Sequence, residues 1–491
     1  MPAGVRRLAR RRPLCALTVG IAGVGLPLPP IPLYAQETGV EGRWTGGLSI
    51  LGQDLGFSVE FERSEGDLRA RIDIPTQGAL GLALRRVSET GASVHFELPA
   101  GPGLAVWDGE RAGDVIEGTF TQAGAEGTFR VMRDDAAGAG APPEDPPDED
   151  VPYRQQELAF DNGDVHLEGT LTLPEDGGPF PAVVMVTGSG AQNRDEELFG
   201  FRPFRIIADH LTRRGVAVYR YDDRGVGNST GNVGLSTTSD FADDVLAAIA
   251  MLSAHEEIDD GRIGIVGHSE GGVVAPLAAS RSGSVAFVVL IAPTSVPGAD
   301  VIFEQGAEIA RTAGQSEAQI ANGQALQRRI FEAVADGEDL AALRGELDTV
   351  IRAQLAASPE AQRAAITDVD AFVDAQLDQQ LAAVASPWFR FFLTYDPAPA
   401  LRRTTVPVLA IFGERDLQVT PSQNRGPLAE ALGANPDVTI ETLPGANHLF
   451  QTATTGSPAE YATLPKEFVP GFLDLISSWI VDRAGARGDG R

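Results

Sequence analysis

Cysteine and lysine are almost absent from this sequence: it contains one cysteine, and Lys466 is its only lysine. A single cysteine excludes a disulfide framework and any thiolate-rich metal site. Basic residues are also scarce, because 39 lysines and arginines face 68 aspartates and glutamates, for a formal net charge of −29. Such a chain repels phosphate backbones, so we expect no nucleic-acid partner.

Long apolar runs are equally rare, and the one candidate lies at the N-terminus. Arginines at residues 6–12 precede an apolar run at residues 14–28, and the small residue Ala35 follows. This order is typical of a secretory signal peptide. We therefore predict a signal peptide over residues 1–35, export to the periplasm or the medium, and no stable membrane insertion after its removal. The alternative is an N-terminal membrane anchor, but the run is short and proline-broken for a span of ~20 residues.

The remaining composition is typical of a globular protein. Hydrophobic residues make up 43% of the 491 and charged residues 22%, which excludes wholesale disorder. This length predicts two or three domains of roughly 100–200 residues each. The sequence indicates no oligomeric state.

Residues 36–133 alternate between apolar and polar side chains in short segments, for example at 57–61, 68–72 and 94–98. Glycine, aspartate and proline separate these segments, which predicts a small antiparallel β domain with one solvated face. Residues 134–152 are acidic, rich in proline and contain no aromatic residue. We expect them to form a linker.

The pattern changes from Tyr153 onward. Apolar strand-like runs at 167–173, 181–187, 216–221, 262–267 and 285–291 alternate with helical segments at 202–214, 241–254 and 270–280. Such alternation predicts a parallel sheet covered on both faces. Residues 297–404 have helical spacing instead, for example at 325–334 and 373–384, and the alternation resumes with 407–412, 422–432, 438–443 and 466–481. A helical lid at 297–404 therefore interrupts an α/β core at 153–296 and 405–485.

A possible nucleophile stands in the pattern Gly-x-Ser-x-Gly, which occurs around Ser269 and again around Ser229. A nucleophilic serine of this type needs a buried strand directly before it and a helix directly after it. Only Ser269 has both, in the apolar segments 262–266 and 272–279. We predict Ser269 as the nucleophile.

A serine hydroxyl needs a base to take its proton, and the base needs an orienting carboxylate. His448 is the only histidine after Ser269, and it follows the predicted strand 438–443. Asp416 follows the strand 408–412 and is the predicted acid, with Glu414 as the alternative. This chain order, serine then acid then histidine, is the one that strand–serine–helix hydrolases use.

The oxyanion of the reaction needs two backbone N–H donors. We assign one to Glu270, directly after Ser269, and the other to Ser189 in the loop after strand 181–187, with Gly190 as the alternative. The Glu270 side chain has two interpretations: it binds a substrate amine, or it forms a salt bridge with Arg194 or Arg224.

Four motifs, at residues 187–195, 221–229, 267–272 and 413–416, resemble those of bacterial α/β-hydrolases of the secreted carboxylesterase and serine aminopeptidase-like branch. The resemblance implies an eight-stranded, mostly parallel sheet, a Ser269–His448–Asp416 triad and a lid inserted after the sixth strand. It also implies that Asp223, Arg224 and Ser229 belong to a structural loop.

The predicted function is that of an exported serine hydrolase, which cleaves a small-molecule carboxylic ester through an acyl-enzyme and requires neither metal nor cofactor. One alternative is a serine aminopeptidase or amidase, with Glu270 or Glu304 as the amine anchor. The other is a non-catalytic protein that binds a ligand through its β domain. Aromatic lid residues are candidates for the substrate pocket wall or for packing within the lid: Trp388, Phe389, Phe391 and Phe392.

Overall fold

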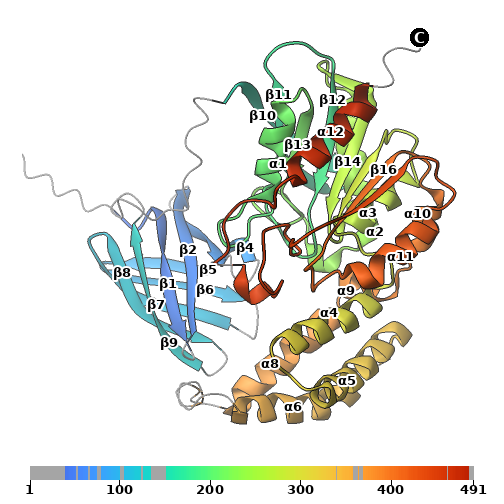
Figure 1. Cartoon of the computed structure of the whole chain (residues 1–491). Coiled ribbons are helices and arrows are strands. Elements are labelled where there is room, and N and C mark those ends of the chain that lie inside the picture. The colour runs from blue at the N-terminus through green and yellow to red at the C-terminus, as the bar shows by residue number, and fades with distance from the viewer. Residues whose placement is uncertain are drawn as a thin grey trace, which may run out of the picture. The chain divides into compact units, whose positions relative to one another are not determined.

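A computed structural model describes residues 39–485, with gaps at 51–52, 65–66, 75–78, 100–103, 123–124, 134–150, 339, 358–362, 364–365, 367–368 and 462. The predicted signal peptide and nearly all of the predicted linker lie outside the described residues. Figure 1 shows the β domain in blue and cyan, and the α/β core and the lid in green to red.

The N-terminal β domain is one antiparallel sheet in which strands that are consecutive in sequence are neighbours except for β4 and β5, and β1 pairs with β9. Strands β4 and β5 stand at opposite ends of the strand order, but only Leu84 separates them in sequence, so the two ends of the sheet meet there. Its strands are β1 (Gly42–Ile50), β2 (Gln53–Ser64), β3 (Asp67–Ile74), β4 (Ala79–Ala83), β5 (Arg85–Thr90), β6 (Ser93–Pro99), β7 (Leu104–Ala112), β8 (Val115–Gln122) and β9 (Ala125–Arg133).

Aromatic side chains fill the interior of this domain because the strands alternate as predicted. Phe57 and Phe61 are buried in β2, whereas Glu60 between them is exposed. Phe96 stacks on Trp107 with ring centroids 5.1 Å apart. The predicted antiparallel β domain is confirmed.

The α/β core is built on a second sheet of eight strands in the order β10-β11-β13-β12-β14-β15-β16-β17. Every neighbouring pair from β13 to β17 is parallel, and β11 alone is antiparallel to its neighbours. The predicted mostly parallel sheet is therefore confirmed. The strands are β10 (Tyr153–Asn162), β11 (Val165–Pro174), β12 (Phe180–Val186), β13 (Ala217–Tyr221), β14 (Ile258–His268), β15 (Val288–Ile291), β16 (Val408–Gly413) and β17 (Val438–Leu443).

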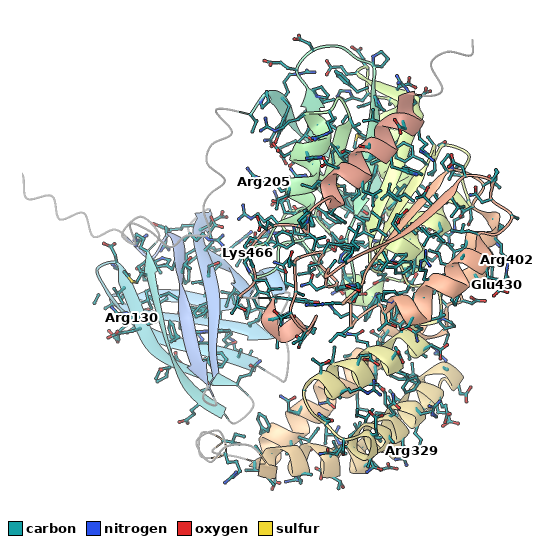
Figure 2. All side chains as sticks on the ribbon, viewed as in Figure 1. Arg130, Arg205, Arg329, Arg402, Glu430 and Lys466 are labelled. Carbon is teal, nitrogen blue, oxygen red and sulfur yellow. The ribbon has the colours of Figure 1, made fainter. Side chains whose placement is uncertain are left out.

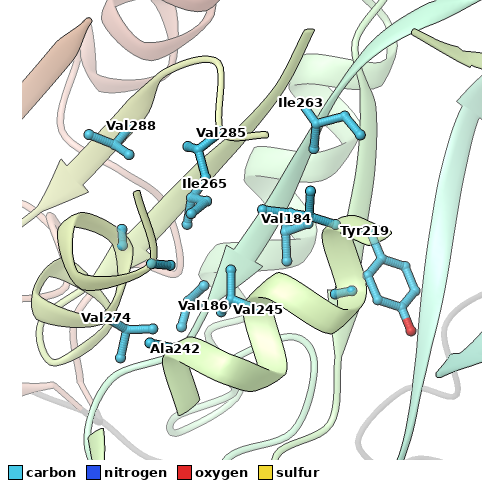
Figure 3. Packing of buried hydrophobic residues seen from close by; sticks show 14 of the residues in the cluster. Val184, Val186, Tyr219, Ala242, Val245, Ile263, Ile265, Val274, Val285 and Val288 are labelled. Atoms are coloured by element: carbon cyan, nitrogen blue, oxygen red, sulfur yellow. The ribbon is translucent and has the colours of Figure 1, made fainter. Parts of the chain in front are cut away.

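Helices cover both faces of this sheet because its central strands are apolar on both sides. Val184 and Val186 belong to a hydrophobic cluster that also includes side chains from helices α2, α3, α10 and α11 (Figure 3). Val183 and Met185 belong to the opposite cluster, which contains α1 and α12. The helices are α1 (Pro203–Thr212), α2 (Thr238–Ser253), α3 (Gly271–Ala279), α10 (Ala398–Arg403), α11 (Pro421–Ala431) and α12 (Phe472–Gly485).

The lid separates β15 from β16 and consists of helices, as predicted. It has an apolar cluster of its own, formed by Leu347, Ile351, Val373 and Leu377. Charged side chains cover its outside (Figure 2), and among them Arg329 donates to Glu346 at 2.8 Å. Its helices are α4 (Gly298–Thr312), α5 (Glu317–Asp336), α6 (Arg344–Ala357), α8 (Val369–Val384) and α9 (Pro387–Thr394).

Two elements differ from the prediction. The last helix begins at Phe472 and not near residue 466, because Pro470 and Gly471, which has a φ of +86°, precede it. Strand β10 was not predicted at all, since most of its side chains are exposed and its polar residues do not alternate with apolar ones. None of the helices in the described part of the chain has the length and hydropathy that a membrane span requires.

Candidate active site

Ser269 lies on a sharp turn between strand β14 and helix α3, with a φ of +53°. Glycine is required on both sides of Ser269, because neighbouring backbone atoms approach these positions too closely for a side chain. A Cβ atom on Gly267 would lie 2.1 Å from the Gly271 carbonyl oxygen, and one on Gly271 would lie 2.3 Å from that of Val186. The strained serine between a buried strand and a helix is the geometry of a nucleophile elbow.

Ser229, in the second copy of the motif, has a different environment. It is buried, its hydroxyl donates to the Asp222 carbonyl at 2.9 Å, and it accepts from the Glu168 N–H at 3.0 Å. No helix or strand adjoins it in the described chain. The Ser229 hydroxyl therefore stabilises a loop, in line with the structural role that the resemblance implies.

His448 and Asp416 meet in a buried hydrogen bond at the carboxyl edge of the sheet. His448 Nδ1 lies 2.8 Å from Asp416 Oδ2, and the Asp416 side chain has an exposed fraction of 0%. Two backbone N–H groups, of Gln418 and Val419, donate to the other carboxylate oxygen at 2.8 and 2.9 Å. A carboxylate held in this way fixes the orientation and tautomer of the imidazole.

The rival acid, Glu414, points elsewhere. It is exposed and accepts from the Gly445 N–H at 2.8 Å. Of the two candidates, Asp416 is the one that the structure places against His448.

The loop after β12 lies directly beside Ser269. A Cβ atom on Gly188 would be 3.2 Å from the Ser269 Cβ. Thr187 anchors this loop by donating to both oxygens of the half-buried Asp223 carboxylate at 2.9 Å. Burial raises the pKa of Asp223 well above its ordinary range, although the Gln192 N–H and the Thr187 hydroxyl lower it.

The predicted oxyanion donors, the backbone N–H groups of Ser189 and Glu270, donate to no protein acceptor in the described part of the chain. The Gly188 N–H is already engaged, because it donates to Glu196 Oε1 at 2.7 Å. Neither predicted donor is therefore engaged by another group of the described chain.

The remaining contact of the predicted triad, between Ser269 and His448, is not formed in this structure. Within the described residues the Ser269 hydroxyl makes no hydrogen bond to His448, whose ring instead lies 4.7 Å from that of His268, the residue before Ser269. Catalytic hydrogen bonds of unliganded enzymes are often long and shorten when substrate binds.

The Glu270 side chain is fully buried and contacts uncharged donors. It accepts from the Thr238 hydroxyl at 2.7 Å, from Trp388 Nε1 at 3.0 and 3.1 Å, and from the Ser189 hydroxyl. Burial raises the pKa of this carboxyl above its ordinary value.

Neither predicted salt bridge of Glu270 is present. Arg194 pairs with Asp222 at 2.7 Å, and Arg224 pairs with Asp244 at 2.7 Å. Both arginines pair with carboxylates other than that of Glu270, so the salt-bridge interpretation of Glu270 is wrong.

Of the aromatic residues on lid helix α9, Trp388 is the one that reaches the elbow. The others pack within the lid: Phe389 contacts Phe331 at 5.8 Å, Phe391 stacks on Tyr395 at 5.0 Å, and Phe392 stacks on Trp388 at 5.6 Å. The hydrogen bond from Trp388 to Glu270 therefore ties α9 to the residue that follows Ser269.

We expect Trp388→Phe to loosen helix α9. The phenyl ring can still stack on Phe392, but the substitution removes the N–H···carboxylate bond to Glu270. A bond of this kind contributes about 1.5–3 kcal/mol, so the population of the locally opened α9 should rise about tenfold or more. Hydrogen–deuterium exchange of the α9 amides measures this opening. Trp479→Phe is the control, because its indole donates to Thr439 on the opposite face of the sheet. Unchanged exchange of α9 in Trp388→Phe would mean that this bond does not hold the lid.

Glu196 and His268 form a buried pair that sequence reasoning missed. Glu196 has a φ of +51° and an exposed fraction of 3%, and its Oε1 lies 2.8 Å from His268 Nδ1. A carboxylate within the polar run Asn-Arg-Asp-Glu-Glu at residues 193–197 gives no signal of burial, and His268 occupies a variable position of the Gly-x-Ser-x-Gly motif. Among the described residues no group of three or more histidine, cysteine, aspartate and glutamate side chains could hold a metal ion.

A parallel sheet with a strand–serine–helix elbow, a histidine–carboxylate pair after later strands and a helical lid define an α/β hydrolase. The serine aminopeptidase S33 family matches residues 202–452, more than half of the chain. The chain therefore belongs to that family of hydrolases.

Individual proteins are also similar to this chain. Esterase EstD of Thermotoga maritima is 27% identical over 317 residues, which are 64% of this chain and 65% of EstD, so the match spans less than two thirds of that relative. Two solved structures are similar to this chain, each with a TM-score of 0.42. The α/β hydrolase GrgF of Penicillium sp. sh18 is 15% identical, with 68% of this chain and 98% of that one covered. A proline iminopeptidase of Mycobacterium smegmatis is 17% identical, with 67% and 99% covered.

Proposed function

We propose that this hydrolase is a serine carboxylesterase that uses Ser269, His448 and Asp416 as its catalytic triad. The observation that carries the proposal is the buried bond between His448 and Asp416 next to the strained Ser269 elbow. The name of EstD, an esterase, favours the same reaction.

In the proposed mechanism Ser269 Oγ attacks the ester carbonyl carbon while His448 Nε2 takes the hydroxyl proton. The carbonyl oxygen becomes an oxyanion that accepts from the Ser189 and Glu270 N–H groups. His448 then gives its proton to the leaving alkoxide, which departs as alcohol and leaves an acyl-enzyme. Water, deprotonated by His448, attacks the acyl group, and the reverse steps release the acid and free Ser269.

The family name supports a second candidate, an aminopeptidase or amidase on the same triad. Such an enzyme needs an acidic anchor for the free amine of its substrate, and Glu270 is a buried carboxyl next to the nucleophile. Both Glu270 oxygens, however, already accept hydrogen bonds from Thr238, Ser189 and Trp388. An amine would have to displace these donors, which favours the ester.

A substrate panel tests the choice. We expect the purified protein to hydrolyse short p-nitrophenyl esters with a kcat/KM at least about 100-fold above that for aminoacyl p-nitroanilides, because the amine has no open anchor. A protein that cleaves only the anilides would overturn the esterase in favour of the aminopeptidase. A protein that cleaves neither and takes no fluorophosphonate label would support a binding protein instead.

We further propose that the protein is exported, on the grounds of the basic and apolar N-terminal segment. The assignment of residues 1–35 as signal peptide, 36–133 as β domain and 134–152 as linker belongs to this proposal. N-terminal sequencing of the protein from the periplasm or medium would start at Gln36 if cleavage follows Ala35. A start at residue 1 or 2 in a membrane fraction would support the N-terminal anchor.

A further inference from the structure

Glu196 and His268 are two buried ionisable side chains that the triad does not use. Their exposed fractions are 3% and 6%. Apolar side chains border them, among them Phe204, Ile207 and Phe450. Such surroundings penalise an unpaired charge, so the two groups must either be neutral or compensate each other.

The hydrogen bonds of His268 limit the protonation states that the pair can adopt. Its Nδ1 lies 2.8 Å from Glu196 Oε1, and its Nε2 lies 3.0 Å from the His448 carbonyl oxygen. The carbonyl oxygen is an acceptor, and a neutral imidazole carries only one N–H group. A neutral ring therefore fits only if Glu196 carries a proton and donates it to Nδ1. If Glu196 is ionised, only the doubly protonated ring satisfies both partners, since a neutral ring would place a lone pair against one of them.

The charge balance supports the same state. Burial alone would lower the pKa of His268, but the Glu196 carboxylate raises it by its charge and its hydrogen bond, and the resulting pKa lies above the ordinary 6.5. The other ionisable groups that face the ring are Asp416, whose charge acts in the same direction, and His448, whose backbone carbonyl raises the pKa of His268 and whose ring lies 4.7 Å from that of His268.

The pair contacts both loops that acyl transfer needs. Glu196 Oε1 also accepts from the Gly188 N–H at 2.7 Å, which orients the peptide next to the proposed Ser189 donor. His268 donates to the backbone of His448 and is the residue before Ser269. The Glu196 and His268 side chains thus connect three segments. These are the loop after β12 that holds Gly188 and Ser189 (the oxyanion loop), the nucleophile elbow at Ser269, and the loop after β17 that holds His448 (the His448 loop).

We propose that Glu196 and His268 form a lasting carboxylate–imidazolium pair that positions the oxyanion loop and the His448 loop against Ser269. They are positioning residues, because they act through Gly188 and His448 and not on the substrate. This role rests on the proposed serine-hydrolase function, but the protonation of His268 does not.

The stabilising effect of the pair should depend on pH. Because the folded-state pKa of His268 is raised above 6.5, its contribution to stability is complete below that pH and is lost as the pH rises through the folded-state pKa. We therefore expect the alkaline limb of the kcat profile to report the loss of the His268 proton.

The test combines NMR on the wild type with the variant Glu196→Gln. In the wild type at about pH 7.5, where an ordinary histidine is mostly neutral, a long-range ¹H–¹⁵N spectrum should show one ring with both nitrogens protonated. Loss of that signal in His268→Gln assigns it. The matched control is Glu197→Gln, the neighbouring carboxylate, which accepts from Arg202 at 2.8 Å.

Glutamine keeps an acceptor for the Gly188 N–H but removes the charge, and its NH₂ group can donate to a neutral Nδ1. We expect His268 to become neutral near pH 7.5, kcat to fall about 100-fold, KM to stay within about twofold, and the alkaline limb to move to lower pH. Glu197→Gln should retain the wild-type protonation of His268, kcat, KM and alkaline limb. A neutral His268 in the wild type would overturn the proposal, as would a Glu196→Gln enzyme with wild-type kcat and alkaline limb. If Ser269→Ala remained active, the function would fail while the NMR result still reported on the pair.

Discussion

Replacing Ser269 by alanine should lower kcat for a short p-nitrophenyl ester by roughly 10⁵–10⁶-fold. The hydroxyl is the only proposed nucleophile, and removal of a triad serine leaves only the contribution of the oxyanion donors and of binding. The fold should be unaffected, because the Ser269 hydroxyl makes no hydrogen bond within the described chain. Steady-state kinetics together with a thermal unfolding curve measure both effects.

Ser229→Ala is the matched control, since it removes the same hydroxyl from the other copy of the motif. Its buried hydroxyl bonds to the backbone of Asp222 and Glu168. We expect a loss of about 1–3 kcal/mol in the free energy of unfolding, with kcat retained. The reverse pattern, an active Ser269→Ala and an inactive Ser229→Ala, would show that the nucleophile is assigned to the wrong motif.

The second large effect is expected for Asp416→Asn, which should lower kcat by roughly 10⁴-fold. The amide keeps the shape of the side chain but removes the charge that stabilises the imidazolium, and its NH₂ group disfavours the productive tautomer of His448. KM should change little, because Asp416 is buried behind the histidine. The measurement is kcat for the ester at the pH optimum of the wild type.

Glu414→Gln is the control for this prediction. Glu414 lies in the same loop, is exposed, and bonds only to the Gly445 N–H among the contacts described. Its glutamine variant should retain kcat within about threefold. A large loss in Glu414→Gln with an active Asp416→Asn would identify Glu414 as the acid.

The α/β core could be predicted from the sequence because parallel strands are buried on both faces. Strands β15 and β16 consist entirely of buried residues and read as continuous apolar runs. Strand β10 lacked that signal, since it lies at the sheet edge with polar side chains. The way the N-terminal sheet curls at Leu84 depends on pairing between distant strands, which local alternation does not specify.

The triad candidates could be named in advance because each follows a strand at the same edge of a parallel sheet. Asp416 follows β16 and His448 follows β17, so the topology places both near Ser269. Context also separated Ser269 from Ser229, since only one of the two motifs joins a strand to a helix. These residue roles remain predictions that the variants above test.

The buried contacts around the triad could not be predicted. Glu196 and His268 are 72 residues apart, and Glu270 and Trp388 are 118 apart. No local pattern indicates which acidic side chain of a polar loop turns inward. The prediction that Glu270 pairs with an arginine failed for this reason: charge suggested a partner, whereas the fold supplied neutral donors.

The most direct test of the central claim is to label the purified protein with a fluorophosphonate and to map the modified residue by mass spectrometry. Because the reagent reacts with a serine that a neighbouring base activates, we expect one phosphonylated peptide, modified at Ser269, and no labelling in His448→Ala. Labelling at Ser229 or another serine, or no labelling of a folded wild-type protein, would contradict the account.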